Sequence, residues 1–394
     1  MLLFFVFVCW AVVAVVGLEE HFGSKSPYRA ANEPPTSNLN YTAVFLLSRH
    51  GSRFPTTKHL KQYSKLGKNA LLVNWTFPEF NSENEGLLTQ AGKLEMKRLG
   101  QLTKVLFASL FVKPAYHPRE FELRSSKVIR TLQSASAFAS GLFGQEEPFA
   151  IESESLGSDL LLRFHENCLR YQATKKDKTP SVDGILAPVL SKLHKKFGGL
   201  ELSVKQVKYL WSACMFQGVG QPNSACQYFD KQDAELLEFA NDVGDFWEKA
   251  FGSEINYAMS CPLLEHIIES IDLGKRRFLF GHAENIMPVM TALGYFKEDP
   301  EMYQAGGLGS WRERKWRSGL VSPFGANLFV ATYADKTGER FVQLWHNGVL
   351  LSLAHLCNGK STDCPWSEFK ASLQANMGAC NFSSICAATP PLDK

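Results

Sequence analysis

Along the first part of the chain, segments with the apolar pattern of a strand alternate with segments whose apolar residues recur at helical spacing. A continuous apolar run over residues 41–48, rich in β-branched and aromatic side chains, predicts a buried strand. Leucines and alanines recur at helical spacing over residues 88–110, with a threonine suited to the N-cap position near the start. A shorter strand at residues 120–124 and a helix starting near residues 125–126 repeat this order. The pattern predicts strand–helix units.

The same alternation returns toward the C-terminus. Residues 276–281 predict a strand and residues 284–296 a helix, and two more strands are predicted at 327–333 and 341–347. The dipeptide Asn347-Gly348 is a pair that tight hairpin turns prefer, because both positions of such a turn adopt positive φ. Strand–helix units therefore lie at both ends of the chain.

The middle of the chain has a different character. Lysine clusters and a long amphipathic segment within residues 151–262 predict helices, with little signal for strands. We therefore predict an α/β fold with a mostly parallel sheet flanked by helices, and a second, smaller all-α domain inserted into it. In this division residues 1–17 are a signal peptide, 18–150 and 263–394 form the α/β domain, and 151–262 form a helical cap domain.

The composition is that of an ordinary globular protein. Of the 394 residues, 45% are hydrophobic and 21% are charged, which is enough for a large core. The formal net charge of +3 is too small to indicate binding to nucleic acid or to a membrane surface. Any strongly basic site must therefore be local.

The N-terminal segment indicates export. Residues 2–17 are apolar without interruption, short for a membrane span, and end in small residues suited to cleavage after Gly17. An uncleaved N-terminal anchor is the alternative. The other end shows no hydrophobic tail and no ER-retention tetrapeptide. We therefore predict a protein that is secreted or lies in the lumen of the secretory pathway, without a membrane anchor after cleavage.

Cysteines and sequons agree with this location. Nine cysteines minus Cys9, which leaves with the signal peptide, give eight, an even number that predicts four disulfides. The close pairs Cys214 with Cys226 and Cys357 with Cys364 fit two of them, although spacing does not fix the connectivity. Sequons for surface glycosylation begin at Asn40, Asn74 and Asn381.

Three predicted strands end in residues that can carry chemistry. Arg49-His50 follows the first strand, Arg130 lies shortly after the second, and His282-Ala-Glu284 follows the strand at 276–281. The carboxyl ends of parallel strands meet at one edge of an open α/β sheet, where ligands bind. We therefore expect these side chains to lie close together.

Together these side chains suit a phosphate ester. A neutral imidazole of His50 could attack phosphorus in line, and the carboxyl of Glu284 could protonate the leaving alkoxide. Guanidinium groups bind phosphate bidentately and stabilise its transition state, and three lie in the motifs: Arg49, Arg53 and Arg130. This chemistry requires no metal and no cofactor. Each residue alone has a simpler explanation, as a structural histidine or a solvated arginine, and only their joint arrangement supports the hypothesis.

The motifs also carry a family resemblance. "RHGSRFP" at residues 49–55, followed by "HAE" at 282–284, resembles the histidine acid phosphatase family (histidine phosphatase, clade 2), and His-Ala-Glu is similar to its multiple inositol polyphosphate phosphatase branch. The blocks "LTQAGKLEMKRLG" and "SSKVIRTLQSASAFASGLF" resemble the same branch. The resemblance implies an α/β domain with a smaller α domain. It implies His50 as nucleophile, Glu284 as proton donor, and as phosphate ligands Arg49, Arg53, Arg130 and His282.

The resemblance also implies substrates. They are inositol hexakisphosphate and lower inositol phosphates, and related enzymes act on 2,3-bisphosphoglycerate as well. Lys58, with His59 and Lys61, could bind further phosphates of such a substrate; a solvated basic turn is the alternative. His165 stands where the resemblance implies an aromatic residue. Two other functions stay open: a broad-specificity secreted acid phosphatase, and a non-catalytic binder of phosphate or inositol phosphate.

Overall fold

The computed structural model describes most of the chain. The described residues are 17–28, 39–66, 80–112, 115–144, 148–175, 179–218, 224–304 and 311–388. Within these ranges no helix is long and apolar enough to cross a membrane. The predicted signal peptide, up to residue 16, and the sequon at Asn74 lie outside the described residues.

A single sheet forms the centre of the molecule. Its seven strands are β1 (Tyr41–Arg49), β2 (Phe121–Ser125), β3 (Arg276–Gly281), β4 (Asn327–Ala334), β5 (Arg340–His346), β6 (Val349–Leu350) and β7 (Cys364–Pro365). The order is β2-β3-β1-β4-β5-β6, with β7 paired to β5. β3 runs parallel to both β1 and β2, and all other pairs are antiparallel.

The α/β class is confirmed, but the sheet is mixed rather than mostly parallel. The reason is visible in the connections of its C-terminal half. Residues 335–339 join β4 to β5, and so short a link can only reverse the chain, whereas a parallel pair needs a crossover of a dozen residues or more. Asn347 and Gly348, with φ of 50° and 82°, form the predicted two-residue hairpin between β5 and β6.

Helices surround the sheet and extend beyond one end of it. The α-helices are α2 (Thr57–Leu66), α3 (Gln90–Leu106), α4 (Ile129–Phe143), α5 (Phe164–Asn167), α6 (Leu169–Thr174), α7 (Asp183–Lys196), α8 (Val204–Gln217), α9 (Lys231–Lys249), α10 (Ile255–Ala258), α11 (Cys261–Asp272), α12 (Ala283–Ala292), α13 (Ser318–Val321), α14 (Trp366–Met377) and α15 (Phe382–Cys386). Short 3-10 turns are η1 (Glu19–His21), η2 (Gly23–Lys25), η3 (Ala108–Leu110), η4 (Ala225–Tyr228), η5 (Pro300–Tyr303) and η6 (Trp311–Glu313).

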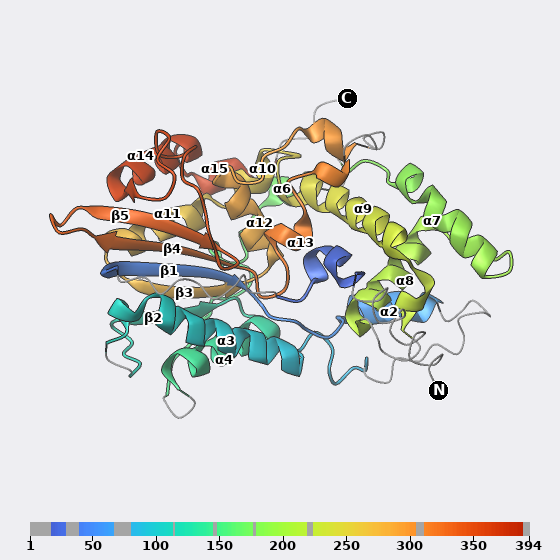
Figure 1. Ribbon diagram of the computed structural model, residues 1–394, viewed down its shortest axis with the longest axis horizontal. Coiled ribbons are helices and arrows are strands. Elements are labelled where there is room, and N and C mark those ends of the chain that lie inside the picture. Colours follow the sequence, from blue (N-terminus) through green and yellow to red (C-terminus); the bar gives the residue numbers. More distant parts are fainter. Residues whose placement is uncertain are drawn as a thin grey trace, which may run out of the picture.

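Both faces of the sheet are buried. Along β1, Phe45 and Leu47 join the hydrophobic cluster on one face, and Val44 and Leu46 join the cluster on the other, as the two-residue period of a strand requires. The helices α3 and α4 cover the second face, and α11, α12 and α14 lie on the first (Figure 1). Burial on both faces explains why β1 reads as a continuous apolar run.

Most predicted elements of the α/β part are confirmed, with one shifted boundary. Thr89 caps α3, its side chain accepting a hydrogen bond from the backbone N–H of Gly92 at 3.0 Å. The helix predicted to start near residues 125–126 begins instead at Ile129. Ser126 cannot act as its cap because its hydroxyl bonds to Thr131 and to His282.

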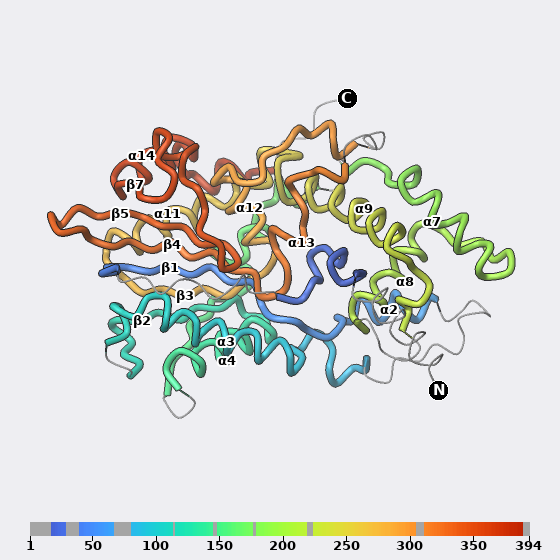
Figure 2. The backbone as a smooth tube through the Cα atoms, viewed as in Figure 1, coloured from blue at the N-terminus to red at the C-terminus, as the bar shows by residue number. Residues whose placement is uncertain are grey.

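The segment 151–262 is helical, as predicted. It contains α5 to α10 and the first two residues of α11, and α7, α8 and α9 lie beyond the end of the sheet (Figures 1 and 2). One hydrophobic cluster runs from the sheet into these helices and includes Leu47, Leu210 and Phe239. The domain boundaries at 150/151 and 262/263 stay a prediction.

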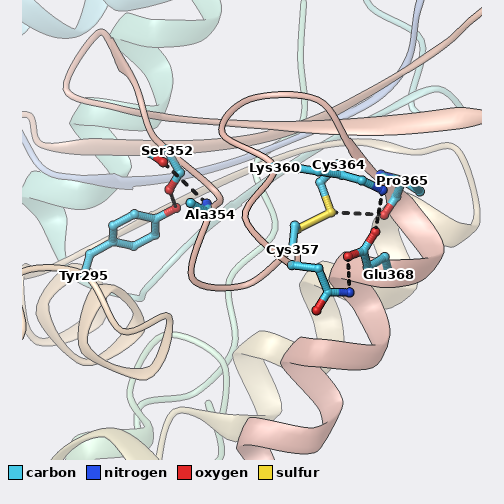
Figure 3. The surroundings of a disulfide bond; sticks show 9 residues. Tyr295, Ser352, Ala354, Cys357, Lys360, Cys364, Pro365 and Glu368 are labelled. Atoms are coloured by element: carbon cyan, nitrogen blue, oxygen red, sulfur yellow. Dashed lines mark hydrogen bonds and ion pairs between the residues drawn. A yellow bond between two sulfur atoms is a disulfide. The ribbon is translucent and has the colours of Figure 1, made fainter.

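Four disulfides link the described cysteines, the predicted number. Both close pairs are present, Cys214–Cys226 and Cys357–Cys364, and the others are Cys168–Cys386 and Cys261–Cys380. Figure 3 shows the Cys357–Cys364 bridge at the start of α14, where Glu368 accepts hydrogen bonds from Asn358 at 2.6 Å and Lys360 at 2.9 Å. The bridge and these bonds fix the loop before α14 to the edge of the sheet.

Candidate active site

The carboxyl ends of β1, β2 and β3 lie in register at one edge of the sheet. Arg49 at the end of β1 is paired with Gly281 at the end of β3, and Ser125 at the end of β2 is paired with Phe280. The backbone N–H of His50 still donates to the carbonyl of Gly281, at 3.0 Å. The parallel half of the sheet therefore brings the three predicted motifs to one place.

The loop after β1 packs directly against the start of α3. Glu95 accepts hydrogen bonds from the backbone N–H of Ser52 at 2.9 Å and from its hydroxyl at 2.8 Å. Gly51 and Gly92 permit this contact: a Cβ on Gly51 would lie 2.5 Å from the carbonyl oxygen of Gly92. The loop that carries His50 is thus held by backbone packing and a half-buried carboxylate.

His50 is buried, and its hydrogen bonding fixes its tautomer. Nδ1 lies 2.9 Å from the backbone carbonyl of Gly51, which can only accept, so Nδ1 carries the proton and Nε2 keeps its lone pair. Burial lowers the pKa of His50 well below its usual value, and the charges of Arg49 and Arg130 lower it further. The imidazole is therefore neutral at physiological pH, the form that can act as a nucleophile.

Arg49 is fixed by carbonyl groups and an aromatic ring. Its Nη1 donates to the backbone carbonyl of Ser322 at 2.6 Å and to that of Ser24, and its guanidinium carbon lies 4.7 Å from the centroid of the Phe324 ring. Burial lowers the pKa of Arg49 to about 10, against the raising effect of Glu284. The guanidinium therefore stays charged at neutral pH, although burial makes this position unfavourable for a cation without an anion beside it.

Arg53 has a similar environment. Its guanidinium carbon lies 5.0 Å from the ring centroid of Phe216 and 5.9 Å from that of Phe324, and Nη1 donates to the carbonyl of Phe54 at 2.9 Å. Burial, followed by the charges of Arg130 and Arg49, lowers the pKa of Arg53 to about 9. An anion bound between these arginines would relieve their repulsion.

The arginines also have unused donors. The Nε atoms of Arg49, Arg53 and Arg130 are buried without a hydrogen-bond partner among the described residues. Buried donors without partners cost free energy, and an anion bound between the guanidinium groups would offset the cost of burying their charges. The site is therefore built for a small oxyanion.

His282 is aligned by the residues on either side of its ring. Nη2 of Arg130 lies 3.3 Å from Nδ1 of His282 and must donate to it, because a guanidinium group cannot accept a hydrogen bond. Nε2 of His282 therefore carries the proton, and it donates to the hydroxyl of Ser126 at 3.0 Å. Burial and then Arg130 lower the pKa of His282 well below its usual value. The rings of His50 and His282 lie 5.6 Å apart, so two neutral imidazoles face the same space.

Glu284 supplies a carboxylate beside these rings. It is the second residue of α12, and its side chain is 34% exposed. Its Oε1 lies 3.6 Å from Nζ of Lys249, the last residue of α9. Burial raises the pKa of Glu284, but Lys249, His165 and His282 outweigh burial and hold it well below its usual value. Glu284 is therefore ionised in the free protein at neutral pH.

The basic residues after the motif differ in their exposure. Lys58 and Lys61 are exposed on α2, so their role in binding substrate stays a prediction. His59 is half-buried: its Nδ1 accepts from the Thr56 hydroxyl at 2.7 Å, and burial and Arg53 lower its pKa to about 2. His59 is therefore uncharged at neutral pH and cannot attract an anion by its charge.

Several residues of the site carry no sequence signal that pointed to it. Lys25 is half-buried and follows Ser24, whose carbonyl binds Arg49. Burial lowers the pKa of Lys25 to about 8 against the opposing effect of Asp245. No role could be assigned to Lys25 from sequence. The aromatic walls, Phe216 and Phe324, come from segments far from the motifs.

The comparison with known families agrees with this geometry. A model of the histidine phosphatase superfamily (branch 2) matches residues 42–347. The chain belongs to this superfamily. The matched region begins within β1 and ends just after β5, so it spans all three strand ends of the site.

Similar proteins are named as multiple inositol polyphosphate phosphatases, acid phosphatases and phytases. The chain is 27% identical to multiple inositol polyphosphate phosphatase 1 of Gallus gallus, over 95% of this chain and 94% of that protein. It is also 27% identical to the Homo sapiens protein of the same name, over 94% of this chain and 89% of that protein. Among solved structures, the phytase from D. castellii superposes with a TM-score of 0.79 at 17% identity, covering 94% of this chain and 87% of that one. The Bifidobacterium longum multiple inositol polyphosphate phosphatase, in complex with inositol hexasulfate, superposes with a TM-score of 0.66 at 18% identity, covering 91% of this chain and 98% of that one. These structures share the fold.

Proposed function

We propose that this protein is a secreted phosphomonoesterase that hydrolyses inositol polyphosphates, inositol hexakisphosphate and its lower products, through a phosphohistidine at His50. The observation that carries this proposal is the unprotonated Nε2 of His50 among three arginines, Arg49, Arg53 and Arg130, whose charges act on its ring. A neutral nucleophile among cations suits a phosphate group and not a neutral substrate.

The first half of the reaction transfers the phosphoryl group to the protein. The lone pair of His50 Nε2 forms the new P–N bond while the bond from phosphorus to the leaving oxygen breaks. The carboxyl group of Glu284, in its protonated form, gives its proton to the departing alkoxide. The three arginines and His282 bind the phosphoryl oxygens, and they stabilise the charge spread over them in the transition state.

The second half returns the protein to its starting state. A water molecule attacks the phosphorus of the phosphohistidine, and the carboxylate of Glu284 takes the proton that this water loses. The P–N bond breaks, its electron pair returns to Nε2 of His50, and inorganic phosphate leaves. The proton that Glu284 gave to the alcohol in the first half is thus recovered in the second.

Two observations favour a polyphosphate over a simple phosphomonoester. Two relatives that cover nearly the whole chain, at 27% identity, are named for inositol polyphosphates, and one structural neighbour was solved with inositol hexasulfate; acid phosphatases of Schizosaccharomyces pombe cover the chain as fully at 25% and 23% identity. Lys25 adds positive charge near the arginines. Burial lowers its pKa, Asp245 opposes this, and the charges of Arg49 and Arg53 lower it further, so a further anionic group near it would be stabilised. The four disulfides and the exposed sequon asparagines Asn40 and Asn381 support secretion.

The test is phosphate release by the purified secreted protein. We would compare inositol hexakisphosphate, 2,3-bisphosphoglycerate and p-nitrophenyl phosphate, each with EDTA present. We expect release from the inositol substrate with the highest kcat/KM, total loss in His50→Ala, and a loss of about 10²- to 10⁴-fold in Glu284→Gln with alkyl leaving groups. His117→Ala and Glu313→Gln change exposed residues away from the site and serve as matched controls.

Each other outcome would point to a different function. Release from p-nitrophenyl phosphate alone would make the protein a general acid phosphatase. Tight binding of inositol hexakisphosphate without release would make it a binding protein. Full activity in His50→Ala would contradict the phosphohistidine, and trapping of labelled phosphate on acid-quenched wild-type protein checks the intermediate directly.

A further inference from the structure

Lys249 joins two carboxylates at the edge of the site. Its Nζ lies 2.6 Å from Oδ1 of Asp245, one helical turn earlier in α9, and 3.6 Å from Oε1 of Glu284 in α12. Only 17% of the side chain of Lys249 is exposed, and the same is true of Asp245. Figure 2 shows the end of α9 reaching toward α12, so the ammonium connects the helical part of the chain to the sheet edge.

Lys249 is also the cation closest to Glu284. Among the described residues, no other lysine, arginine or histidine lies within ion-pair distance of the Glu284 carboxylate. The effect is reciprocal: burial lowers the pKa of Lys249, but Asp245 and Glu284 outweigh burial and raise it. The ammonium therefore keeps its charge throughout the pH range in which a carboxyl group titrates.

Other charged groups face Glu284 from every element around it. The imidazole of His165 in α5 is buried, its Nδ1 has no described hydrogen-bond partner, and burial lowers its pKa to about 4. The further groups that interact with Glu284 are Arg49, Arg53, Arg130, Tyr171, Glu248 and His282. After burial, which acts in the opposite direction, Lys249 has the largest influence on the carboxylate.

We propose that Lys249 is a positioning residue for Glu284: it holds the carboxylate in the free site and sets the pH above which Glu284 can no longer protonate a leaving group. The inference rests on the proposed function. The ion pair favours the carboxylate, which is the form required in the hydrolysis half-reaction. A bound phosphate dianion opposes it, since a second negative charge beside Glu284 favours the protonated form required in the first half.

The test is the pH profile of Lys249→Met. A group that must donate a proton loses activity as the pH rises through its pKa, so removing Lys249 raises that pKa and moves the basic limb of kcat/KM to higher pH. With β-glycerophosphate, whose alkoxide is a poor leaving group, we expect the basic limb of Lys249→Met to shift upward by about one pH unit or more. At a pH above the wild-type limb, the variant should then keep about tenfold more of its maximal activity than the wild type does. With p-nitrophenyl phosphate, whose leaving group needs little protonation, the limb should stay in place.

Three variants control the experiment. Lys249→Arg keeps the charge and should keep the wild-type limb. Asp245→Asn removes the other partner of Lys249 and should move the limb in the opposite direction, to lower pH. If Lys249→Met does not fold because Asp245 is left buried and unpaired, the double variant Lys249→Met/Asp245→Asn removes both charges. An infrared titration of the protonated carboxyl band, assigned by its loss in Glu284→Gln, reports the ionisation of Glu284 without turnover.

The outcomes separate this inference from the proposed function. A basic limb and an infrared midpoint that do not move in Lys249→Met would overturn it. So would a KM that rises equally at every pH, since that result makes Lys249 a substrate ligand. A wild-type protein that released no phosphate from any substrate would overturn the proposed function, and the infrared titration would still decide whether Lys249 controls the ionisation of Glu284.

Discussion

Gly51→Ala tests whether backbone packing behind His50 sets the geometry of the site. A Cβ at this position would lie 2.5 Å from the carbonyl oxygen of Gly92, and ordinary contacts begin near 3.4 Å, so the loop or α3 must move by about 0.9 Å. The obstacle is backbone in the first turn of α3, which cannot rotate away as a side chain could. The displacement therefore falls on the loop that holds His50 and Arg53.

The structure gives a size for the effect. A misplacement of about 1 Å of a reacting group costs about 10²-fold in rate, and overpacking costs about 1–3 kcal/mol of stability. We expect Gly51→Ala to lower kcat about 100-fold while the free energy of unfolding, from urea titration, falls by no more than about 3 kcal/mol. Steady-state kinetics on inositol hexakisphosphate measures the first quantity.

The control is Gly184→Ala. Gly184 lies in α7 with nothing within 4 Å of its added Cβ, so this change should keep full activity and add up to about 1 kcal/mol of helix stability. Wild-type kcat in Gly51→Ala would refute the reasoning, because it would mean that the loop absorbs the shift without moving His50. Loss of folding in Gly51→Ala but not in Gly184→Ala would show that the contact with α3 is structural instead.

Two further predictions concern stability. Burial lowers the pKa of His346 from 6.5 to about 4, so its contribution to stability is complete above pH 6.5 and falls by about 3 kcal/mol as the pH drops to about 4. In urea titrations at pH 7 and pH 4.5, His346→Gln should lose less stability on acidification than wild type, and an equal loss would contradict the assignment. The Cys168–Cys386 bridge spans 218 residues and Cys357–Cys364 only 7, although the intact Cys261–Cys380 bridge shortens the longer loop. In the chain-entropy model, replacing both cysteines of the longer bridge by serine therefore costs about 2 kcal/mol more than the same change in the shorter one. Equal losses of melting temperature in the two double-serine variants would argue against that model here.

The parts of the site on strand ends could be predicted because sequence pattern and topology determine them together. The apolar run of β1 fixes where the strand ends, and the parallel pairing of β1 with β3 then places Arg49 opposite Gly281. His50, Arg130, His282 and Glu284 follow from that placement. The start of α4 was misjudged for a physical reason: Ser126 resembles a helix cap, yet its hydroxyl is engaged by His282 and Thr131.

The remaining site residues could not be found from local sequence. Lys249 reads as an ordinary lysine in the last turn of a helix, where it also complements the helix dipole. Only the tertiary packing of α9 against α12 shows that it contacts Glu284. The mixed sheet was missed for a similar reason, since the direction of β4 depends on how it pairs and not on its own pattern.

The strand order has a consequence for how the protein is made. β3 lies between β1 and β2 in the sheet, but residues 126–275 separate it from β2 along the chain. During synthesis the first two strands therefore emerge with the place between them empty, and the sheet edge cannot form until the helical segment has been translated. His50 then stays without its partners His282 and Glu284 until β3 and the start of α12 have been made, so the newly made chain cannot be active before that point.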